Sequence, residues 1–207
     1  MGDAAQDNES VHASGGATAG EPPDLVGWFY TWWRDDSLPA LSPVPDLAAA
    51  PGGDEQLVAT MMGTDVETVR ERMRQGHRPW LARIGDKPVG WGWVAASEAA
   101  IAELGIAINL PSGDRYLWDF VTQPSWRGRG VYAALLQAIL AQEGAARYWI
   151  GHDVGNIASV RGITNAGFRV VGAVRRMEDG HVAFVPDGST DRAEAAATLL
   201  GLPVTDP

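Results

Sequence analysis

The chain has 207 residues, and its 45% hydrophobic content is enough to bury one substantial core. Its 26 acidic and 16 basic side chains give a formal net charge of −10, which argues against nucleic acid as a partner because phosphate attracts a basic surface. The absence of cysteine excludes disulfides, thiolate metal sites and a cysteine nucleophile.

The first 22 residues combine Gly, Ala, Ser, Asp and Glu with almost no large apolar side chain. So little apolar surface cannot offset the entropy of ordering, and we predict that residues 1–22 are disordered. They lack the basic start and apolar stretch of a secretory signal, and no run of about 18 apolar residues occurs that could span a membrane. We therefore expect a cytoplasmic protein with no membrane partner.

The segment at residues 25–33, LVGWFYTWW, brings five aromatic side chains together. We expect these rings to pin the segment onto the core, because aromatic side chains dominate packing, with a wall of a substrate pocket as the alternative. Residues 46–50 are predicted to form a short strand, and residues 53–62 a helix with one apolar face. Thr64 is the expected N-cap of a second helix, because Glu67 follows at capping-box spacing.

The period of the apolar residues then changes. Short apolar runs at residues 80–84 and 89–95 predict a β-hairpin, whereas residues 101–110 fit either a strand or a helix. With the later elements, this order predicts one mixed α/β domain over residues 23–186. Those elements are strands at residues 116–121, 148–150, 168–174 and 182–185, helices at 131–142 and 156–166, and a weak helix or tail at 187–207.

A glycine-rich loop, Arg127-Gly128-Arg129-Gly130, joins a strand to the longest predicted helix. Glycine lets backbone N–H groups converge, and the helix start adds unpaired N–H groups and the positive end of its dipole. Such a unit binds phosphate well, and the two arginines add charge. A solvated, arginine-bearing turn is the alternative.

This segment resembles the acetyl-CoA-binding signature of the GNAT N-acetyltransferase superfamily, Gln/Arg-x-x-Gly-x-Gly/Ala. Arg127 and Gly130 match the signature, whereas Tyr132 stands where a small residue is usual. Asn156 and Ser159, followed by Gly-Phe, resemble the family's second block. The resemblance implies a single GNAT-like domain: a central mixed, mostly antiparallel sheet flanked by helices, with a strand–helix–strand acetyl-CoA-binding core.

The resemblance also implies how acetyl-CoA is bound. Main-chain groups of the strand before the loop would pair with the pantetheine arm, and amides at the start of the helix would bind the pyrophosphate. Side chains of the following helix would meet the pantetheine or a phosphate. The implied binding residues are Phe120, Val121, Thr122, Arg127, Gly128, Arg129, Gly130, Val131, Tyr132, Ala133, Asn156 and Ser159.

The catalytic groups depart from the family's pattern. Many members have a tyrosine seven residues after the asparagine, as the acid for the leaving thiolate, and this position is Ile163 here. Tyr132, Tyr148 or a water would have to take that role, and the need is limited because a thiol is a good leaving group.

Asp119 is the first candidate for the general base. It lies on the strand that would present the thioester, where the family often has a carboxylate, and strand alternation predicts that it shares an apolar face with Leu117 and Val121. A buried carboxylate bonded to a turn is the alternative. Glu103 is the second candidate, and His152 could relay a proton. No two histidines have metal-ligand spacing, so we expect no metal.

The sequence therefore predicts an enzyme that moves an acetyl group from acetyl-CoA to a primary amine of a small molecule or peptide. Direct attack in a ternary complex is expected, because no cysteine is present. A non-catalytic GNAT-like module that binds CoA is the alternative function. A homodimer is compatible with the sequence, and the acceptor is not identified by it.

Overall fold

The computed structural model describes residues 24–205, so the disorder expected for residues 1–22 lies outside the described residues. The strands are β1 (Leu25–Trp33), β2 (Leu47–Pro51), β3 (His77–Ile84), β4 (Lys87–Ala95), β5 (Glu98–Ile101), β6 (Ile106–Asn109), β7 (Asp114–Thr122), β8 (Arg147–Asp153), β9 (Arg169–Arg176) and β10 (Val182–Pro186). The helices are α1 (Glu55–Met62), α2 (Val66–Arg74), α3 (Val131–Gln142), α4 (Ile157–Asn165) and α5 (Asp191–Leu200), with 3-10 turns η1 (Ala102–Leu104) and η2 (Pro124–Trp126).

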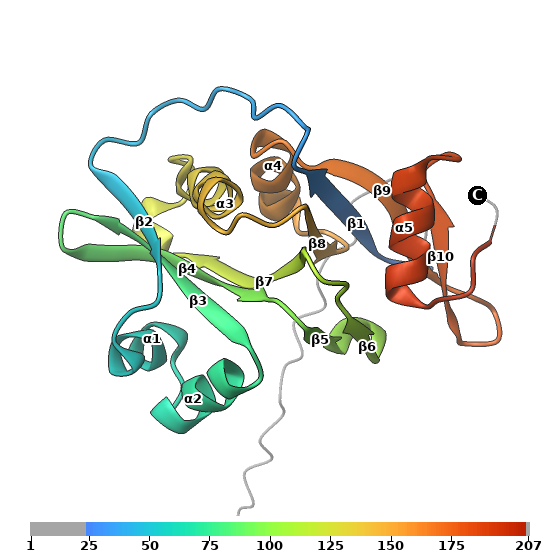
Figure 1. The fold of residues 1–207 in the computed structure, drawn as a ribbon, viewed down its shortest axis with the longest axis horizontal. Coiled ribbons are helices and arrows are strands. Elements are labelled where there is room, and N and C mark those ends of the chain that lie inside the picture. Colours follow the sequence, from blue (N-terminus) through green and yellow to red (C-terminus); the bar gives the residue numbers. More distant parts are fainter. Residues whose placement is uncertain (1–23, 206–207) are drawn as a thin grey trace, which may run out of the picture.

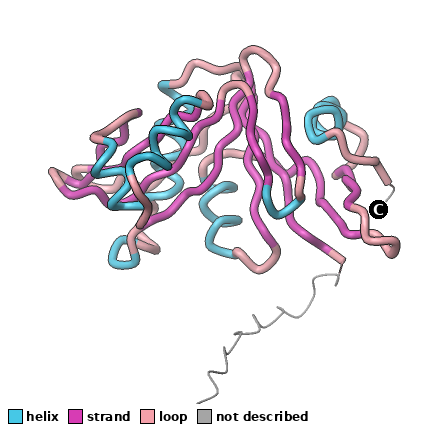
Figure 2. The backbone as a smooth tube through the Cα atoms, turned by 90° about the horizontal axis from the view of Figure 1, so that it is seen from below, coloured by secondary structure: helices cyan, strands magenta, loops and turns pink. Residues whose placement is uncertain are grey.

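Eight strands form one sheet in the order β10-β9-β1-β8-β7-β4-β3-β2, and β5 and β6 form a separate hairpin. All neighbours in the large sheet are antiparallel except β7 and β8. Helices α3 and α4 cover one face, and α1, α2, α5 and the β5–β6 hairpin lie on the other (Figure 1). Figure 2 shows the strands as one layer with helices on both sides. The predicted mixed, mostly antiparallel sheet is confirmed.

Each face of the sheet carries its own apolar core. One side of helix α3 is completely buried, because its apolar residues recur at helical spacing and pack on Leu117 and Ile150 of the sheet. On the opposite face, Val58 of α1 and Val69 of α2 pack on Trp93 of β4. The two cores hold the sheet rigidly between layers. The fully buried α3 side chains are Leu135, Leu136 and Ile139.

The aromatic segment at residues 25–33 is strand β1, which lies inside the sheet between β8 and β9. Its rings do pack on the core: the Phe29 ring lies 5.9 Å from the Trp149 ring, and the Trp32 ring meets the Tyr148 ring edge-on at 5.7 Å. Trp28 and Phe29 also line the main cavity described below, so the alternative, a wall of a substrate pocket, stays a prediction.

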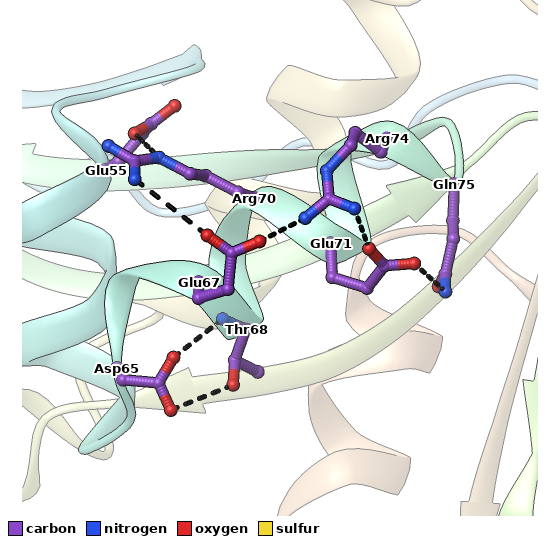
Figure 3. Close-up of polar contacts among 8 residues, drawn as sticks. All are labelled: Glu55, Asp65, Glu67, Thr68, Arg70, Glu71, Arg74 and Gln75. Carbon is purple, nitrogen blue, oxygen red and sulfur yellow. Dashed lines mark hydrogen bonds and ion pairs between the residues drawn. The ribbon is translucent and has the colours of Figure 1, made fainter.

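The expected N-cap of the second helix, Thr64, is wrong by one residue. The Asp65 side chain accepts a hydrogen bond from the Thr68 N–H at 2.8 Å and caps α2 (Figure 3). A carboxylate is favoured there because it also meets the positive end of the helix dipole. Ion pairs between Glu67, Arg70 and Arg74 cover the exposed side of the helix, where solvent screens them, so they contribute little to stability.

Two segments that the sequence left open are now defined. Residues 101–110 are neither one strand nor one helix, because β5 ends at Ile101 and β6 starts at Ile106, with η1 between them. The C-terminal segment contains helix α5, which starts at the Thr190 cap and buries Ala193, Ala196 and Leu200.

Asp36 joins the end of β1 to α5. Its carboxylate, 5% exposed, accepts two hydrogen bonds from Arg192 at 2.7 and 2.9 Å and one from the Trp33 N–H at 2.8 Å, and it lies 3.1 Å from Arg169. Burial alone would raise the pKa of Asp36, but the hydrogen bonds from Arg192 and Trp33, with both arginine charges, hold it below its usual range.

We expect Asp36→Ala to lower the free energy of unfolding by about 3 kcal/mol, because it leaves the Arg192 charge partly buried without a partner. The pKa of Asp36 is lower in the folded protein than in the unfolded chain, where it is about 3.9. The stabilisation is therefore complete above the pKa of the unfolded chain and disappears as the pH falls through the pKa of the folded protein. Chemical denaturation at pH 7 and pH 3 measures both effects. Asp35→Ala is the matched control, because Asp35 is exposed, and an equal loss in both variants would contradict the prediction.

Candidate active site

The sheet opens between β7 and β8. The two strands pair in parallel from Asp114 to Leu117 on β7 and from Arg147 to Ile150 on β8, and the pairing then stops. Beyond this point β7 stays paired with β4, while β8 stays paired with β1 as far as Asp153. The two strands diverge because each follows its other neighbour, which leaves a split in the sheet.

A β-bulge lies on β7 at this split. Trp93 pairs with Trp118 and Trp91 with Val121, so two residues of β7, Asp119 and Phe120, face one residue of β4. Asp119 has a φ of +53°, a left-handed conformation that aspartate tolerates better than most residues.

The bulge depends on Gly92 of β4. A Cβ at this glycine would lie 2.2 Å from the Phe120 ring, so the ring can lie over the neighbouring strand because no side chain stands there. The bulge and this close approach fix the positions of Asp119 and Phe120 together.

The expectation that Asp119 lies on a buried apolar face with Leu117 and Val121 is wrong. The bulge breaks the alternation of the strand, and the Asp119 side chain is 35% exposed. Its Oδ2 accepts a hydrogen bond from Nη1 of Arg72 on α2 at 2.7 Å. The Arg72 guanidinium also lies over the Trp118 ring, 4.6 Å from its centroid, which fixes its position. Asp119 is thus a carboxylate held at the split on the α2 side.

A cavity of about 500 Å³ fills the split and is lined from both faces of the sheet. Tyr132 of α3 and Ser159 of α4 line it from one face, and Arg72 of α2 and Glu103 of η1 line it from the other. Two ligands could therefore enter from opposite faces and meet between the strands. The predicted site residues that reach this cavity are Glu103, Asp119, Phe120, Tyr132, Asn156 and Ser159.

The remaining predicted binding residues lie outside this cavity. Val131 and Ala133 have buried side chains that belong to the core, so any ligand contact there is made by the main chain. The loop before α3 is exposed, and Val121 and Thr122 continue β7 beyond the bulge. The residues outside are Val121, Thr122, Arg127, Gly128, Arg129, Gly130, Val131 and Ala133.

The loop nevertheless has the geometry of an anion site. Gly128 and Gly130 have φ values of +73° and +81°, and Gly130 caps α3 without any side-chain hydrogen bond. The first intrahelical bond runs from the Ala134 N–H to the Gly130 carbonyl, so the N–H groups of the first turn remain free. Arg127 donates to the Thr122 carbonyl at 3.1 Å, and Arg129 stacks over Trp126.

The second family block has a local structural role. Asn156 is the N-cap of α4, and its Oδ1 accepts the Ser159 N–H at 3.1 Å. This bond explains the spacing of three residues and leaves the Asn156 NH₂ group free to donate to a ligand.

Of the two tyrosines that the sequence offered as the acid, Tyr132 and Tyr148, Tyr132 is the one that lines the cavity. Ile163, at the family's usual acid position, is fully buried, and the Tyr148 hydroxyl is buried in the core, where it accepts the Ala145 N–H at 3.0 Å. The Tyr132 ring lies beside Phe120, with centroids 5.5 Å apart. Burial raises the pKa of Tyr132, although hydrogen bonding with Ser159 opposes the shift, so its hydroxyl remains a proton donor at neutral pH.

Gly162 makes room for this tyrosine. A Cβ at Gly162 would lie 2.1 Å from the Tyr132 ring. A glycine inside a helix costs about 1 kcal/mol relative to alanine, so its place in α4 was a signal of close approach.

His152, which the sequence suggested as a proton relay, lines the cavity with its ring held by its neighbours. Its Nδ1 lies 2.8 Å from the Asp153 carbonyl, which can only accept, so Nδ1 carries the proton and Nε2 accepts from the Tyr30 hydroxyl at 2.9 Å. Burial raises the pKa of Tyr30 to about 12, which keeps this donor protonated. Both ring nitrogens of His152 are therefore occupied.

Tyr116 and Asp153 are among the cavity residues that sequence reasoning missed. Burial raises the pKa of Asp153, and the nearby charge of Glu103 raises it further, while His152 opposes the shift. Asp153 ends β8 directly after His152, and its position at a diverging strand end could have been a signal. Tyr116 is 6% exposed and lines the cavity from β7.

The chain belongs to the acetyltransferase (GNAT) family, whose model matches residues 52–168. A GCN5-related N-acetyltransferase from Sphaerobacter thermophilus is similar in fold, with a TM-score of 0.51 and 19% identity over 72% of this chain and 49% of that chain. One from Kribbella flavida has a TM-score of 0.47 and 18% identity over 70% and 54%. This chain thus spans about half the length of these two neighbours.

A structure of AAC(6')-Ib in complex with Parmomycin and AcetylCoA has a TM-score of 0.49 and 16% identity over 67% of this chain and 91% of that chain. None of the curated proteins compared with the chain matches it in sequence. Identities this low show the fold and not the acceptor.

Residues 24–205 contain neither a cluster of metal ligands nor a helix that could cross a membrane. No group of three or more His, Cys, Asp or Glu side chains in this part of the chain could hold a metal ion. No helix in the same range is long and apolar enough to cross a membrane.

Proposed function

We propose that this protein transfers the acetyl group of acetyl-CoA to a primary amine by direct attack in a ternary complex. The observation that carries the proposal is the split between β7 and β8, with a cavity lined from both faces of the sheet. Acetyl-CoA would enter from the face of α3 and α4, and the amine from the face of α2 and η1. The two reactants would be held together between the strands, which supplies proximity.

Several groups of the chain suit acetyl-CoA. The free N–H groups at the start of α3 would bind the pyrophosphate. The edge of β7 facing the split has no strand partner beyond Leu117, so main-chain groups from Phe120 to Thr122 would pair with the pantetheine amides as a strand would. The Asn156 NH₂ group and Ser159 would meet the arm from α4.

The transfer needs one base and little acid assistance. The amine nitrogen bonds to the thioester carbonyl carbon, and the carbon–sulfur bond breaks to release the thiolate. Asp119 would accept the proton that the ammonium loses, with Glu103 as the second candidate. Tyr132 would donate a proton to the thiolate and regain one from the amide nitrogen, which loses its second proton as the tetrahedral intermediate collapses. The absence of cysteine supports direct transfer over a covalent thioester intermediate.

A non-catalytic module that binds CoA is the second candidate function. Tyr132 favours it, because its ring occupies the cavity at a position where the family usually has a small residue. The acceptor under the first proposal is a small-molecule or peptide amine. The cytoplasmic location and the homodimer stay predictions of the sequence.

The cofactor site is tested by Gly130→Glu. At 100 times Kd, acetyl-CoA should add about 2.7 kcal/mol to the free energy of unfolding of the unchanged protein, so its Tm should rise. The Tm of the variant should stay the same with and without acetyl-CoA. The new side chain would place a negative charge at the start of α3, where the pyrophosphate should bind.

The control for this test is Gly180→Glu. Gly180 also has a positive φ, +89°, and open space around its Cβ position, but it lies in the β9–β10 turn. This variant carries the same charge and the same backbone strain, so its Tm should still rise with acetyl-CoA. A full rise in Gly130→Glu would place the pyrophosphate elsewhere.

A further inference from the structure

When Asp119 is the base, two other carboxylates at the rim of the cavity have no part in the proposed transfer. Glu103 on η1 and Asp153 at the end of β8 both line the cavity, and both are exposed. Neither side chain forms a hydrogen bond or ion pair with any residue from 24 to 205. Both carboxylates line the same cavity, and the charge of Glu103 raises the pKa of Asp153.

Nearby cations do not neutralise this pair. Arg72 lines the cavity, but its guanidinium is paired with Asp119 and stacked on Trp118. Both nitrogens of His152 are occupied by hydrogen bonds, as described above. Two like charges left together at one rim repel each other, and a bound cation would remove that repulsion.

Tyr116 lines the same cavity as the two carboxylates. The residue is only 6% exposed, and its hydroxyl has no hydrogen-bond partner among residues 24–205. Burial raises the pKa of Tyr116, and the charges of Glu103 and Asp153 raise it further. Its ring is fixed by stacking on Phe29, with centroids 6.3 Å apart. A fixed hydroxyl at the wall of a cavity, without a protein partner, is suited to a ligand.

The walls of the cavity are aromatic. Trp28 and Phe29 of β1 and Trp118 and Phe120 of β7 line it. Aromatic faces attract ammonium groups, and the aliphatic chain between two ammonium groups packs on the same surfaces. An acidic rim with aromatic walls therefore fits an extended cation better than a neutral or anionic acceptor.

We propose that the acceptor is a diamine or larger polyamine, and that Glu103, Asp153 and the Tyr116 hydroxyl bind its non-reacting ammonium while its other amine meets the thioester beside Asp119. This inference rests on the proposed acetyl transfer and names the class of acceptor for it. The pair of carboxylates determines specificity, whereas Asp119 takes part in the chemistry.

The test compares amines of equal length. Putrescine and cadaverine carry two ammonium groups, butylamine and pentylamine carry one, and γ-aminobutyrate replaces the second with a carboxylate. We expect kcat/KM for the diamines to exceed that for the matched monoamines by about 10-fold or more, with γ-aminobutyrate the poorest acceptor. Equal values for diamines and monoamines would overturn the inference and leave the acetyl transfer intact.

Two variants locate the effect. Glu103→Gln and Asp153→Asn should each raise KM for putrescine about 10-fold, and Asp153→Asn should leave kcat and the KM for butylamine nearly unchanged. Glu178→Gln is the matched control, because Glu178 is an exposed glutamate in the β9–β10 turn. A fall in kcat with butylamine in Glu103→Gln would instead make Glu103 the base and overturn its assignment as a binding group.

A binding measurement separates this inference from the proposed reaction. Calorimetric titration with spermidine, without acetyl-CoA, should show binding that weakens about 10-fold in Glu103→Gln and in Asp153→Asn. If spermidine binds in this way and no amine releases CoA, the cation site stands and the acetyl transfer is wrong. If spermidine does not bind, or binds all variants equally, the cation site is wrong.

Discussion

Replacing Asp119 with asparagine should lower kcat/KM for amine acetylation by about 10²-fold or more, the usual scale for a positioned base, while the Tm stays nearly constant. Asparagine tolerates the φ of +53° at this position, so the bulge should survive. The lost pair with Arg72 is partly exposed and contributes at most about 1 kcal/mol. The acetyl-CoA affinity should also stay nearly constant. Tm, acetyl-CoA affinity and turnover measured on one preparation test these three expectations together.

Asp46→Asn is the matched control for this experiment. Asp46 also has a positive φ, +57°, and is exposed, but it lies before β2 and does not line the cavity. It should change neither activity nor stability. If Asp119→Asn lowers the Tm but keeps normal turnover per folded molecule, the carboxylate has a structural role, and the base is Glu103 or water.

Asp114→Ala should be the most destabilising of the substitutions considered, at about 3–5 kcal/mol. The Asp114 side chain is 2% exposed, and it accepts hydrogen bonds from Arg147 Nε at 2.9 Å and from the indole N–H of the buried Trp149 at 2.8 Å. These bonds join the starts of β7 and β8, directly before the point where the strands diverge. The alanine variant leaves a buried indole N–H and a partly buried guanidinium without their partner.

Urea denaturation of Asp114→Ala measures this loss. Glu178→Ala removes an exposed carboxylate far from the split and should cost less than about 0.5 kcal/mol. Acetyl-CoA affinity should also fall in Asp114→Ala, because the two sides of the split are no longer held together at their base. A change below about 1 kcal/mol would show that backbone pairing and apolar contacts hold β7 and β8 together without Asp114.

Periodicity was sufficient for most elements of this fold. Helix α3 has the bounds expected from its apolar residues, because they recur at helical spacing and a glycine precedes the first. The β3–β4 hairpin is equally local. The interior position of β1 was not predictable, because strand order depends on contacts between residues far apart in the chain.

The residues of the candidate site also divide into those that a local sequence pattern predicts and those that depend on distant contacts. Asn156 and Ser159 were found because a helix cap is a local pattern. The orientation of Asp119 was missed because a bulge depends on the opposite strand, where Gly92 leaves space for Phe120. The grouping of Glu103 with Asp153 was missed because the two residues are far apart in the chain and line one cavity only in the folded protein.

The rate of CoA release from acetyl-CoA, measured with and without a primary amine, tests the central claim most directly. The account predicts release that depends on amine concentration and equals the amount of acetylated amine formed. If acetyl-CoA binds and raises the Tm, yet no putrescine, butylamine or peptide amine accelerates CoA release, the protein is a CoA-binding module and the proposed transfer is wrong.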